Sequence, residues 1–457
     1  MSFCLLSAQS CAILKLSFEK AANYMLKTKK SPKFWLSLVI FSLIGQIAWV
    51  MENMYLNVFI YERFRASADQ ISDMVGASSV AATVTTLLIG ALSDKLGKRK
   101  IFICGGYILW GISIWSFALI NILAPAAAAT TGAVSLGVSL VIVVDCIMTF
   151  FGSAANDAAF NAWLTDSTDE TNRGAAEGIN SMMPMLAILV VFGGAMFLNA
   201  ESPNYWNIIF GVIGTVVFVL GICGFFLIQE PKVDTSANTR YFANLLYGFR
   251  PRVIWHNGKL YLTLLAYAIF GISIQIFMPY LILYYTVSLG MENYVLIFAP
   301  AIVLAAAFTF FYGKVYDRKG FRVSIVPSLS LLMAGYVILY FFRSIVPVFA
   351  GTLIMLCGYL SGMAVFGAML RDHTPENKAG MFQGQRIIAQ VLIPGLIGPA
   401  IGAAVLKNAE LIVNNDGTTS FIPNANIFLA AFIAGVVILL SLIPLFALLK
   451  KEKRHAE

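Results

Sequence analysis

Four charged side chains interrupt long apolar stretches of this 457-residue chain and are the first candidates for chemistry: Glu52, Asp145, Asp157 and Arg386. A charge inside lipid is costly, so such residues usually face a cavity or a partner. The alternative for each is a structural hydrogen bond between helices, or a charge that reaches back to the membrane surface. The neighbours of each charge must decide between a solute pathway and a structural role.

Asp157 is the strongest functional candidate of the four. It lies about 13 Å along a helix from the end of its apolar stretch, and Asn156 and Asn161 flank it. A buried carboxyl among amides can bind a proton or Na⁺. Glu52 and Asp145 lie further outward, where two carboxyls can share one proton or simply line a vestibule. The sequence therefore predicts these three carboxyls as the cation or proton coupling residues.

Polar residues in the first apolar stretch suggest a binding site for hydroxyl groups. Gln46, Asn53 and Asn57 form a stripe, with Trp49 beside it. Amides can pair with the donors and acceptors of a sugar, and an aromatic ring packs on the C–H face of its ring. The alternative is an interface Trp whose neighbouring amides bond other helices.

Arg386 lies near the start of a later apolar stretch, among glutamines at positions 383, 385 and 390. A guanidinium there can engage an anionic substrate or balance Asp157 across a cavity. The alternative is a side chain that reaches back to the inner membrane surface. We therefore add Arg386, with Asn156 and Asn161, to the predicted substrate-binding residues.

Composition places these residues in a membrane protein. The chain is 59% hydrophobic and only 12% charged, whereas a soluble domain carries about 25% charge. Its apolar stretches are long enough to cross about 30 Å of hydrocarbon, and inside lipid they must be helical. An all-α membrane protein with twelve transmembrane helices is predicted, with spans at 34–62, 71–92, 100–123, 133–163, 178–199, 205–229, 260–287, 292–313, 323–343, 346–369, 381–407 and 425–449.

The basic residues predict the orientation. Most of the 31 Lys and Arg residues fall in alternate connections and at both ends, which indicates an even number of spans and cytoplasmic N- and C-termini in a cell membrane. The first 30 residues have no basic leader region, so a cleaved signal peptide is not expected. The predicted domains are a cytoplasmic segment (1–33), two six-helix halves (34–229 and 260–449), a cytoplasmic linker (230–259) with an amphipathic surface stretch, and a basic tail (450–457).

An internal repeat supports the two halves. NAWLTDSTDETNRGAAEG at 161–178 matches GAMLRDHTPENKAGMFQG at 367–384, with Leu, Asp, Thr, Glu and two Gly identical at a constant offset. Two parallel six-helix repeats place a binding site between them near the bilayer midplane. Asp157, Asn156 and Asn161 have no polar counterpart in the second copy, so they predict where that cavity lies.

A second pair of segments follows spans 2 and 8. GALSDKLGKRK at 90–100 and GKVYDRKGFRV at 313–323 share a Gly, an Asp and a second Gly, which are Gly90, Asp94 and Gly97 in the first copy and Gly313, Asp317 and Gly320 in the second. This pattern resembles the signature loop of the major facilitator superfamily. The resemblance to that superfamily extends over nearly the whole chain. The resemblance implies the major facilitator fold, with these loops and the basic Lys98 and Arg99 as a conformational latch on the cytoplasmic side.

NDAAFNAWLTD at 156–166 resembles helix 4 of the glycoside–pentoside–hexuronide:cation symporters, a branch near the sucrose:proton symporters. The resemblance puts that family's cation-site Asp at Asp157 and its helix-1 sugar carboxylate at Gln46, which can bond hydroxyls but cannot ionise. The family's helix-2 aspartates would fall near Ala82 and Thr86. The missing carboxylates favour H⁺ over Na⁺, or no coupling.

The segment GLIGPAIG at 395–402 is similar to the Gly-Pro motif of drug:H⁺ antiporters, which belongs to span 5 and here falls in span 11. We interpret it as a bend and a close-packing element with Pro399 as its hinge. It therefore carries no functional prediction.

The expected function is cation-coupled uptake of a sugar or glycoside by alternating access. The alternatives are an H⁺-antiport exporter of drugs or metabolites and, less favoured, a non-transporting receptor on the same fold. An enzyme, a metal and a cofactor are not expected, because the six Cys and three His residues form no such motif. The net charge of +8 lies in short connections, which disfavours nucleic acid; the expected partners are a small solute and the bilayer, with the chain as a monomer.

Overall fold

The computed structural model describes residues 31–123, 131–169, 172–199, 202–231, 249–291, 293–374, 382–414 and 417–456. The predicted N-terminal segment, apart from its last three residues, lies outside these ranges. So does most of the linker, including the amphipathic stretch before Phe249. The predictions for these segments stay predictions.

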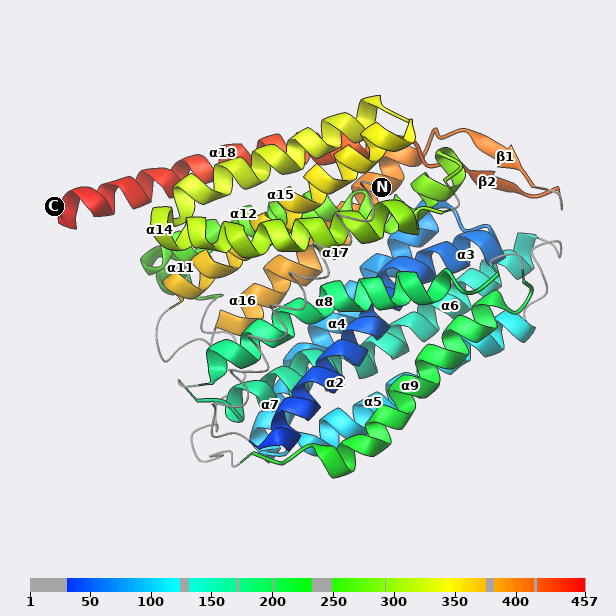
Figure 1. Cartoon of the computed structure of the whole chain (residues 1–457), viewed down its shortest axis with the longest axis horizontal. Helices are drawn as coiled ribbons and strands as arrows, with labels where there is room; N and C mark the ends of the chain where they lie inside the picture. The colour runs from blue at the N-terminus through cyan, green and yellow to red at the C-terminus, as the bar shows by residue number, and fades with distance from the viewer. Residues whose placement is uncertain are drawn as a thin grey trace, which may run out of the picture. The chain divides into compact units, whose positions relative to one another are not determined.

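The first six spans are formed by helices that lie close to the predicted ranges (Figure 1). They are α2 (Pro32–Val50) continued by η1 (Met51–Tyr55) and α3 (Leu56–Phe64); α4 (Ala68–Leu96); α5 (Lys100–Leu123); α6 (Thr131–Gly152) continued by η2 (Ser153–Phe160) and α7 (Asn161–Asp166); α8 (Arg173–Ala195); and α9 (Tyr205–Leu227). The segments η1 and η2 are π-helical. Both interrupt spans that carry predicted coupling carboxyls.

The later part of the chain forms a second set of long helices. They are α11 (Pro251–His256); α12 (Gly258–Gln275) with η4 (Met278–Tyr280), α13 (Leu281–Leu283) and η5 (Tyr284–Ser288); α14 (Val295–Phe341); α15 (Ile345–His373); α16 (Gln383–Ile387) with η7 (Ile388–Leu392) and α17 (Ile393–Leu406); and α18 (Asn426–Ala456). A short hairpin of β1 (Leu411–Val413) and β2 (Thr419–Phe421) precedes α18. The hydropathy pattern did not predict it, because it is too short and too mixed to show a period.

Eleven helices among the described residues are long and apolar enough to cross a membrane. One of them, α14, has 47 residues, about 70 Å at 1.5 Å per residue, which is too long for one crossing. Gly320 breaks it with φ 74° and ψ −180°, and the Tyr312 hydroxyl donates to the Ser324 carbonyl at 2.7 Å. That contact is possible only if the chain reverses at the break, so α14 contains predicted spans 8 and 9.

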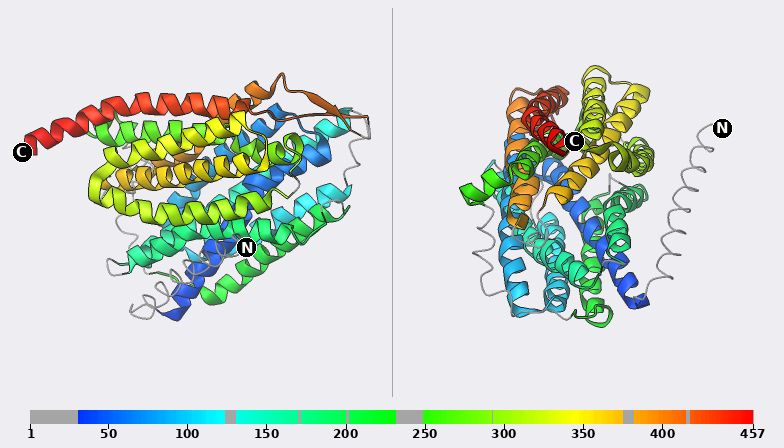
Figure 2. Two further views of the ribbon diagram at one scale, coloured as in Figure 1. Left: turned by 45° about the horizontal axis from the view of Figure 1, so that its top comes forward. Right: turned by 90° about the vertical axis from the view of Figure 1, so that its left-hand side faces the viewer.

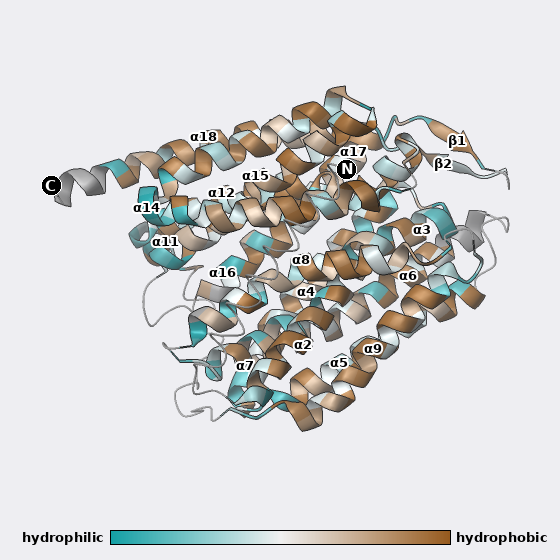
Figure 3. Cartoon of the chain, in the orientation of Figure 1, coloured by the Kyte–Doolittle hydropathy of each residue, from teal (hydrophilic) through white to brown (hydrophobic). Residues whose placement is uncertain are grey.

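The chain forms two compact units (Figure 2). Of the described residues, the first unit contains those up to Gln70, those from Val80 to the end of the α9 segment, and Val413–Ser420; the second contains Ile71–Ser79 and the remainder. In the first unit α5 packs on α9 and α2 on α8; in the second, α14 packs on α15 and α12 on α17 and α18. Hydrophobic residues cover most of the helices and hydrophilic ones gather near their ends (Figure 3).

Glycines allow the closest helix packing in both units. On α17 a Cβ added to Gly395 would collide with Ser79, and one on Gly398 with Gln275. The span-11 segment therefore packs closely against its neighbours, as interpreted from its sequence. On α9, a Cβ on Gly221 would lie 2.6 Å from the Ile108 nitrogen, whereas nothing lies within 4 Å of one on Gly211.

Gly221→Val is expected to lower the free energy of unfolding by about 1–3 kcal/mol, because the added atoms meet the backbone of α5. Gly211→Val is the matched control, since it makes the same change in the same helix at an open position. Thermal unfolding of the detergent-solubilised variants measures both. Equal melting temperatures for the two variants would contradict the packing of α5 on α9.

Candidate functional site

A row of polar side chains follows one side of the fourth span at intervals of four residues: Asp145, Thr149, Ser153, Asp157, Asn161 and Thr165. The Ser153 hydroxyl donates to Asp157 Oδ2 at 2.9 Å. The Asn161 amide donates to the Asp157 carbonyl and the Thr165 hydroxyl to the Asn161 carbonyl, both at 3.0 Å. The row extends over about 30 Å, which matches the thickness of the hydrocarbon core.

The π-helical segment η2 explains how this row stays on one side. In an α-helix, residues four apart differ by about 40° in direction, so a row at that interval drifts around the helix. Bonds to the fifth residue widen the turn and reduce the rotation per residue, which offsets the drift. Ser153 and Asp157 therefore stay aligned with Thr149. Segments of this kind are frequent at functional sites.

Glu52 meets the row from the first span. It lies in η1, is 6% exposed, and accepts a hydrogen bond from the Thr149 hydroxyl at 2.8 Å. Asp145, 1% exposed, lies one turn from Thr149 on the same side of α6. Electrostatic repulsion acts on Glu52 from Asp145 and, more weakly, from Asp157. Glu52 and Asp145 thus both lie near Thr149 in the first unit, whereas Asp157 lies about three turns from Asp145 along the fourth span.

These carboxyls have few partners. Within the described ranges, Glu52 Oε2 and Asp145 Oδ1 are buried and accept no hydrogen bond. The half-buried Asp157 side chain is bonded to Ser153. No three His, Cys, Asp or Glu side chains of the described residues are grouped closely enough to hold a metal ion.

Asn156, predicted as a substrate residue, is part of a buried network. Its amide donates to the Tyr107 hydroxyl, which donates to the Phe41 carbonyl, both at 2.8 Å. Gly45 makes room for it, because a Cβ there would collide with the Asn156 amide. The network ties α2, α5 and η2 together, which favours a structural role for Asn156.

The residues of the predicted polar stripe on the first span have different degrees of burial in the structure. The Asn53 amide donates to the Trp49 carbonyl and the Asn57 amide to the Asn53 carbonyl, each at 2.8 Å. Asn53 is exposed and Asn57 is fully buried, so the two do not face the same surroundings. Gln46 and Trp49 are half-buried. Part of each of these two side chains is therefore exposed.

Trp49 packs against Trp110, with ring centroids 5.0 Å apart. Trp110 is fully buried, and its indole nitrogen has no hydrogen-bond partner among the described residues. Sequence reasoning did not select Trp110, because a Trp inside an apolar span cannot be told from ordinary core. Its contact with Trp49 on another helix is visible only in the tertiary structure.

Arg386 lies on α16 in the second unit and is half-buried. Its charge acts on Tyr267, whose ring stacks on Phe366 at 5.1 Å. The predicted balance between Arg386 and Asp157 would join the two units and stays a prediction.

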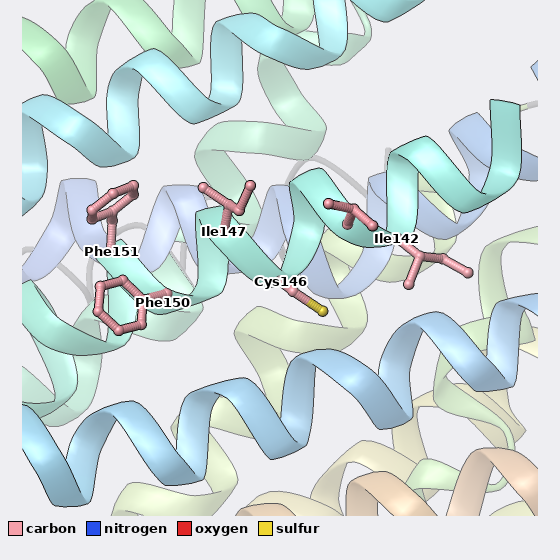
Figure 4. A pocket seen from close by; sticks show the side chains of 6 residues that line it. Ile142, Cys146, Ile147, Phe150 and Phe151 are labelled. Carbon is pink, nitrogen blue, oxygen red and sulfur yellow. The ribbon is translucent and has the colours of Figure 1, made fainter. Parts of the chain in front are cut away.

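A pocket of about 440 Å³ lies along α6 (Figure 4). Its lining contains no polar group other than one thiol: Ile142, Val143, Cys146, Ile147, Phe150 and Phe151. These positions alternate with Asp145 and Thr149 along the helix. The helix therefore has an apolar side and a polar row, and only the row can orient hydroxyl groups.

A second charged cluster closes one end of the first unit. We call it the clasp; it consists of Asp94, Arg99, Asp166 and Glu230. Arg99 is 4% exposed and pairs with Asp94 and, at 2.9 Å, with Asp166. Glu230 accepts from the backbone nitrogen of Arg99, just before α5 begins. The clasp thus joins the ends of α4, α5, α7 and α9.

The latch residues predicted in the first half belong to this arrangement. Gly97 ends α4 in the left-handed region, at φ 63°, so that the chain can turn toward Arg99. The basic run is predicted to keep the loop on the cytoplasmic side; in the structure its Arg99 is buried and forms ion pairs with Asp94 and Asp166. Its partners Asp166 and Glu230 were missed as clasp members, because they are distant in sequence.

The second half has no equivalent clasp among its described residues. Arg322 stands where Arg99 stands in the repeat, yet it is exposed and lies over the Phe446 ring at 5.5 Å. Asp317 is also exposed, and Asp372, the counterpart of Asp166, accepts a hydrogen bond from Tyr316. The two copies share a motif but not the buried ion pairs.

Comparisons with known proteins agree with this fold. A family model described as Major Facilitator Superfamily matches residues 34–399. The structure resembles a bacterial homolog of the human lysosomal transporter Spinster (16% identity, 92% of this chain and 96% of that one, TM-score 0.68). It also resembles the nucleoside transporter NupG (13%, 91% and 98%, 0.63) and a D-xylose-proton symporter (12%, 89% and 97%, 0.66). No curated protein sequence matches the chain.

Arg99→Ala is expected to cost about 3–5 kcal/mol of stability, because it leaves Asp94 and Asp166 without their buried cation. Arg322→Ala is the matched control in the other half and should cost about 0.5–1 kcal/mol, the worth of an exposed cation–π contact. Thermal unfolding in detergent compares them. A larger loss for Arg322→Ala would show that the clasp does not stabilise the first unit.

Proposed function

The chain belongs to the major facilitator superfamily, and from this membership we propose that it takes up a sugar or glycoside together with a proton, by alternating access. The family and its fold make the protein an integral membrane transporter and not an enzyme. The substrate, the coupling ion and the direction are the parts that we propose.

One observation carries the proton coupling: Asp157 belongs to a polar row that crosses the span, and no cation among the described residues pairs with it. In these surroundings the ionised carboxylate carries a large desolvation cost, and protonation removes that cost. The absence of carboxylates at Ala82 and Thr86 favours H⁺ over Na⁺. Protonation would neutralise Asp157 and lower the cost of closing the cavity around it.

The two halves, residues 34–229 and 260–449, would rock against each other about a site near the bilayer midplane. With solute and proton bound, the neutral site can close and reopen on the other face. Without the proton, the charged carboxyl holds the site open to water. This difference would make uptake of solute depend on the proton gradient.

A sugar or glycoside suits the groups that remain accessible. Gln46 can donate to and accept from hydroxyls, and Trp49 offers a ring face. Asn161 lies exposed in the polar row, and Arg386 can bind a solute of partial negative charge. The resemblance of the fourth span to the glycoside–pentoside–hexuronide:cation branch supports the same substrate class. We propose that both termini are cytoplasmic in a cell membrane, because of the basic connections, and that the protein is a monomer.

A second candidate function is export of an apolar drug or metabolite by H⁺ antiport. Its support is the apolar hollow along one side of α6, which has nothing to bond a sugar; Val143, Ile147 and Phe150 are exposed there, so the same surface also suits lipid. The two functions differ in the sign of coupling: an inward proton gradient fills vesicles by symport and empties them by antiport.

Asp157→Asn is expected to abolish proton-driven accumulation of the solute in proteoliposomes while exchange of preloaded solute continues. The amide keeps a neutral group in place but cannot release a proton. Radiolabelled sugars and glycosides, tested singly with and without an inward proton gradient, provide the measurement.

Asp73→Asn, an exposed carboxyl on α4, is the control and should leave accumulation unchanged. Full accumulation by Asp157→Asn would remove the proposed coupling role. Failure of every tested solute to cross would favour the receptor alternative.

A substrate of the proposed class should raise the melting temperature of the purified protein, because it binds only the folded state. A fluorescence melting screen of sugars, glycosides and hydrophobic amines tests the class directly. Trp49→Ala should weaken the shift by a sugar. A shift by amines alone would support export.

A further inference from the structure

We propose that Glu52 and Asp145 together bind one proton, in a site of the first unit that is separate from Asp157. Its role in transport rests on the proposed function. The site itself is argued from contacts within one unit, so it can be tested without any transported solute.

Two unpartnered buried atoms define the site. Glu52 Oε1 accepts from the Thr149 hydroxyl at 2.8 Å, while Glu52 Oε2 accepts nothing from the described residues. Asp145, 1% exposed, also has a buried oxygen, Oδ1, without a donor there. Buried polar atoms rarely stay unpaired. One proton on Glu52 Oε2 that is donated to Asp145 Oδ1 would satisfy both.

Thr149 fixes the two carboxyls near each other. Its hydroxyl holds Glu52 against α6, and Asp145 lies one turn away on the same side, about 6 Å along the axis. Thr149 is therefore a positioning residue for the pair.

The surroundings supply no balancing charge. The other titratable groups within electrostatic reach of the pair are Asp157 and Cys146, both on the fourth span. No Lys, Arg or His of the described chain forms an ion pair with Glu52 or Asp145. Two ionised carboxylates in this setting would repel without compensation. Uptake of one proton from hydronium forms one carboxyl O–H bond and releases water. It changes the charge of the pair from −2 to −1.

The second half shows that the fold does not require these charges. There, Tyr285 in the π-helical segment η5 is hydrogen-bonded to Thr352 on α15. This contact joins the first and fourth spans of its half, as the contact between η1 and α6 does, although by the repeat Thr352 corresponds to Cys146 and not to Thr149. A neutral pair is enough to join the first and fourth spans of a half, so the carboxyls of the first unit need another reason.

The pair and Asp157 form two proton-binding places along one polar row. Thr149 belongs to the first and Ser153 to the second, and these hydroxyls lie on successive turns. Hydroxyls both donate and accept. The proton can thus occupy an outer place at the pair before or after an inner place at Asp157.

Infrared spectroscopy of the full-length protein in lipid tests the site, because a protonated carboxyl has its own carbonyl stretch, which shifts in D₂O. At neutral pH we expect such a band in the unaltered protein. It should persist in Asp157→Asn and, in that background, disappear when Glu52→Gln or Asp145→Asn is added. Asp73→Asn is the control that should leave it unchanged.

Thr149→Val should shift the band, because Glu52 loses its donor, and Thr149→Ser should restore it. A merely structural Thr149 would alter melting but not the band. Thr215→Val, at an exposed threonine on α9, controls for loss of a hydroxyl. Where a carboxyl variant does not fold, the two Thr149 variants still decide.

Disappearance of the band in Asp157→Asn, or its persistence when Glu52→Gln and Asp145→Asn are each added to that variant, would overturn the proposal. These outcomes are distinct from failure of the proposed function. If Asp157→Asn still accumulates solute but the pair's band behaves as expected, the coupling role falls and the proton site stands.

Discussion

Hydrocarbon offers no hydrogen bonds, and most of this structure follows from that constraint. Backbone groups are satisfied within helices, and most polar side chains in the spans bond a carbonyl one turn away or a neighbouring helix. Ser37 and Thr352 do so. Against this background, a buried carboxyl oxygen without a donor is an exception. The exceptions lie on the first and fourth spans of one unit.

The two halves solve the same packing problem with different chemistry. The first half has a buried arginine between two aspartates and a carboxyl pair between its first and fourth spans. The second half has an exposed arginine at the place of Arg99 and a neutral Tyr–Thr contact between its own first and fourth spans. Because the repeat supplies equivalent helices, the neutral version shows what the fold needs. The charges of the first half are additional, and additional charges in lipid are expected where function requires them.

The π-helical segments connect local geometry with function. Each widened turn changes the direction of the side chains that follow it, and it does so beside Glu52 and within the stretch that carries Asp157. Regular α-helices would carry these residues around the helix, away from Thr149 and Ser153. The π-helical turns lose some backbone hydrogen-bond quality, and in return they keep the polar side chains of the span aligned on one side.

The sequence by itself determined where the spans lie, that they are duplicated, and which charges fall inside them, because helix length and hydropathy are local properties. It also selected Glu52, Asp145 and Asp157. Only the tertiary structure decided the partners. It bonded Glu52 to Thr149, put Asn156 in a network with Tyr107, and buried Arg99 beside Asp166. Such partners come from different helices, and hydropathy carries no information about which side of one helix meets which side of another.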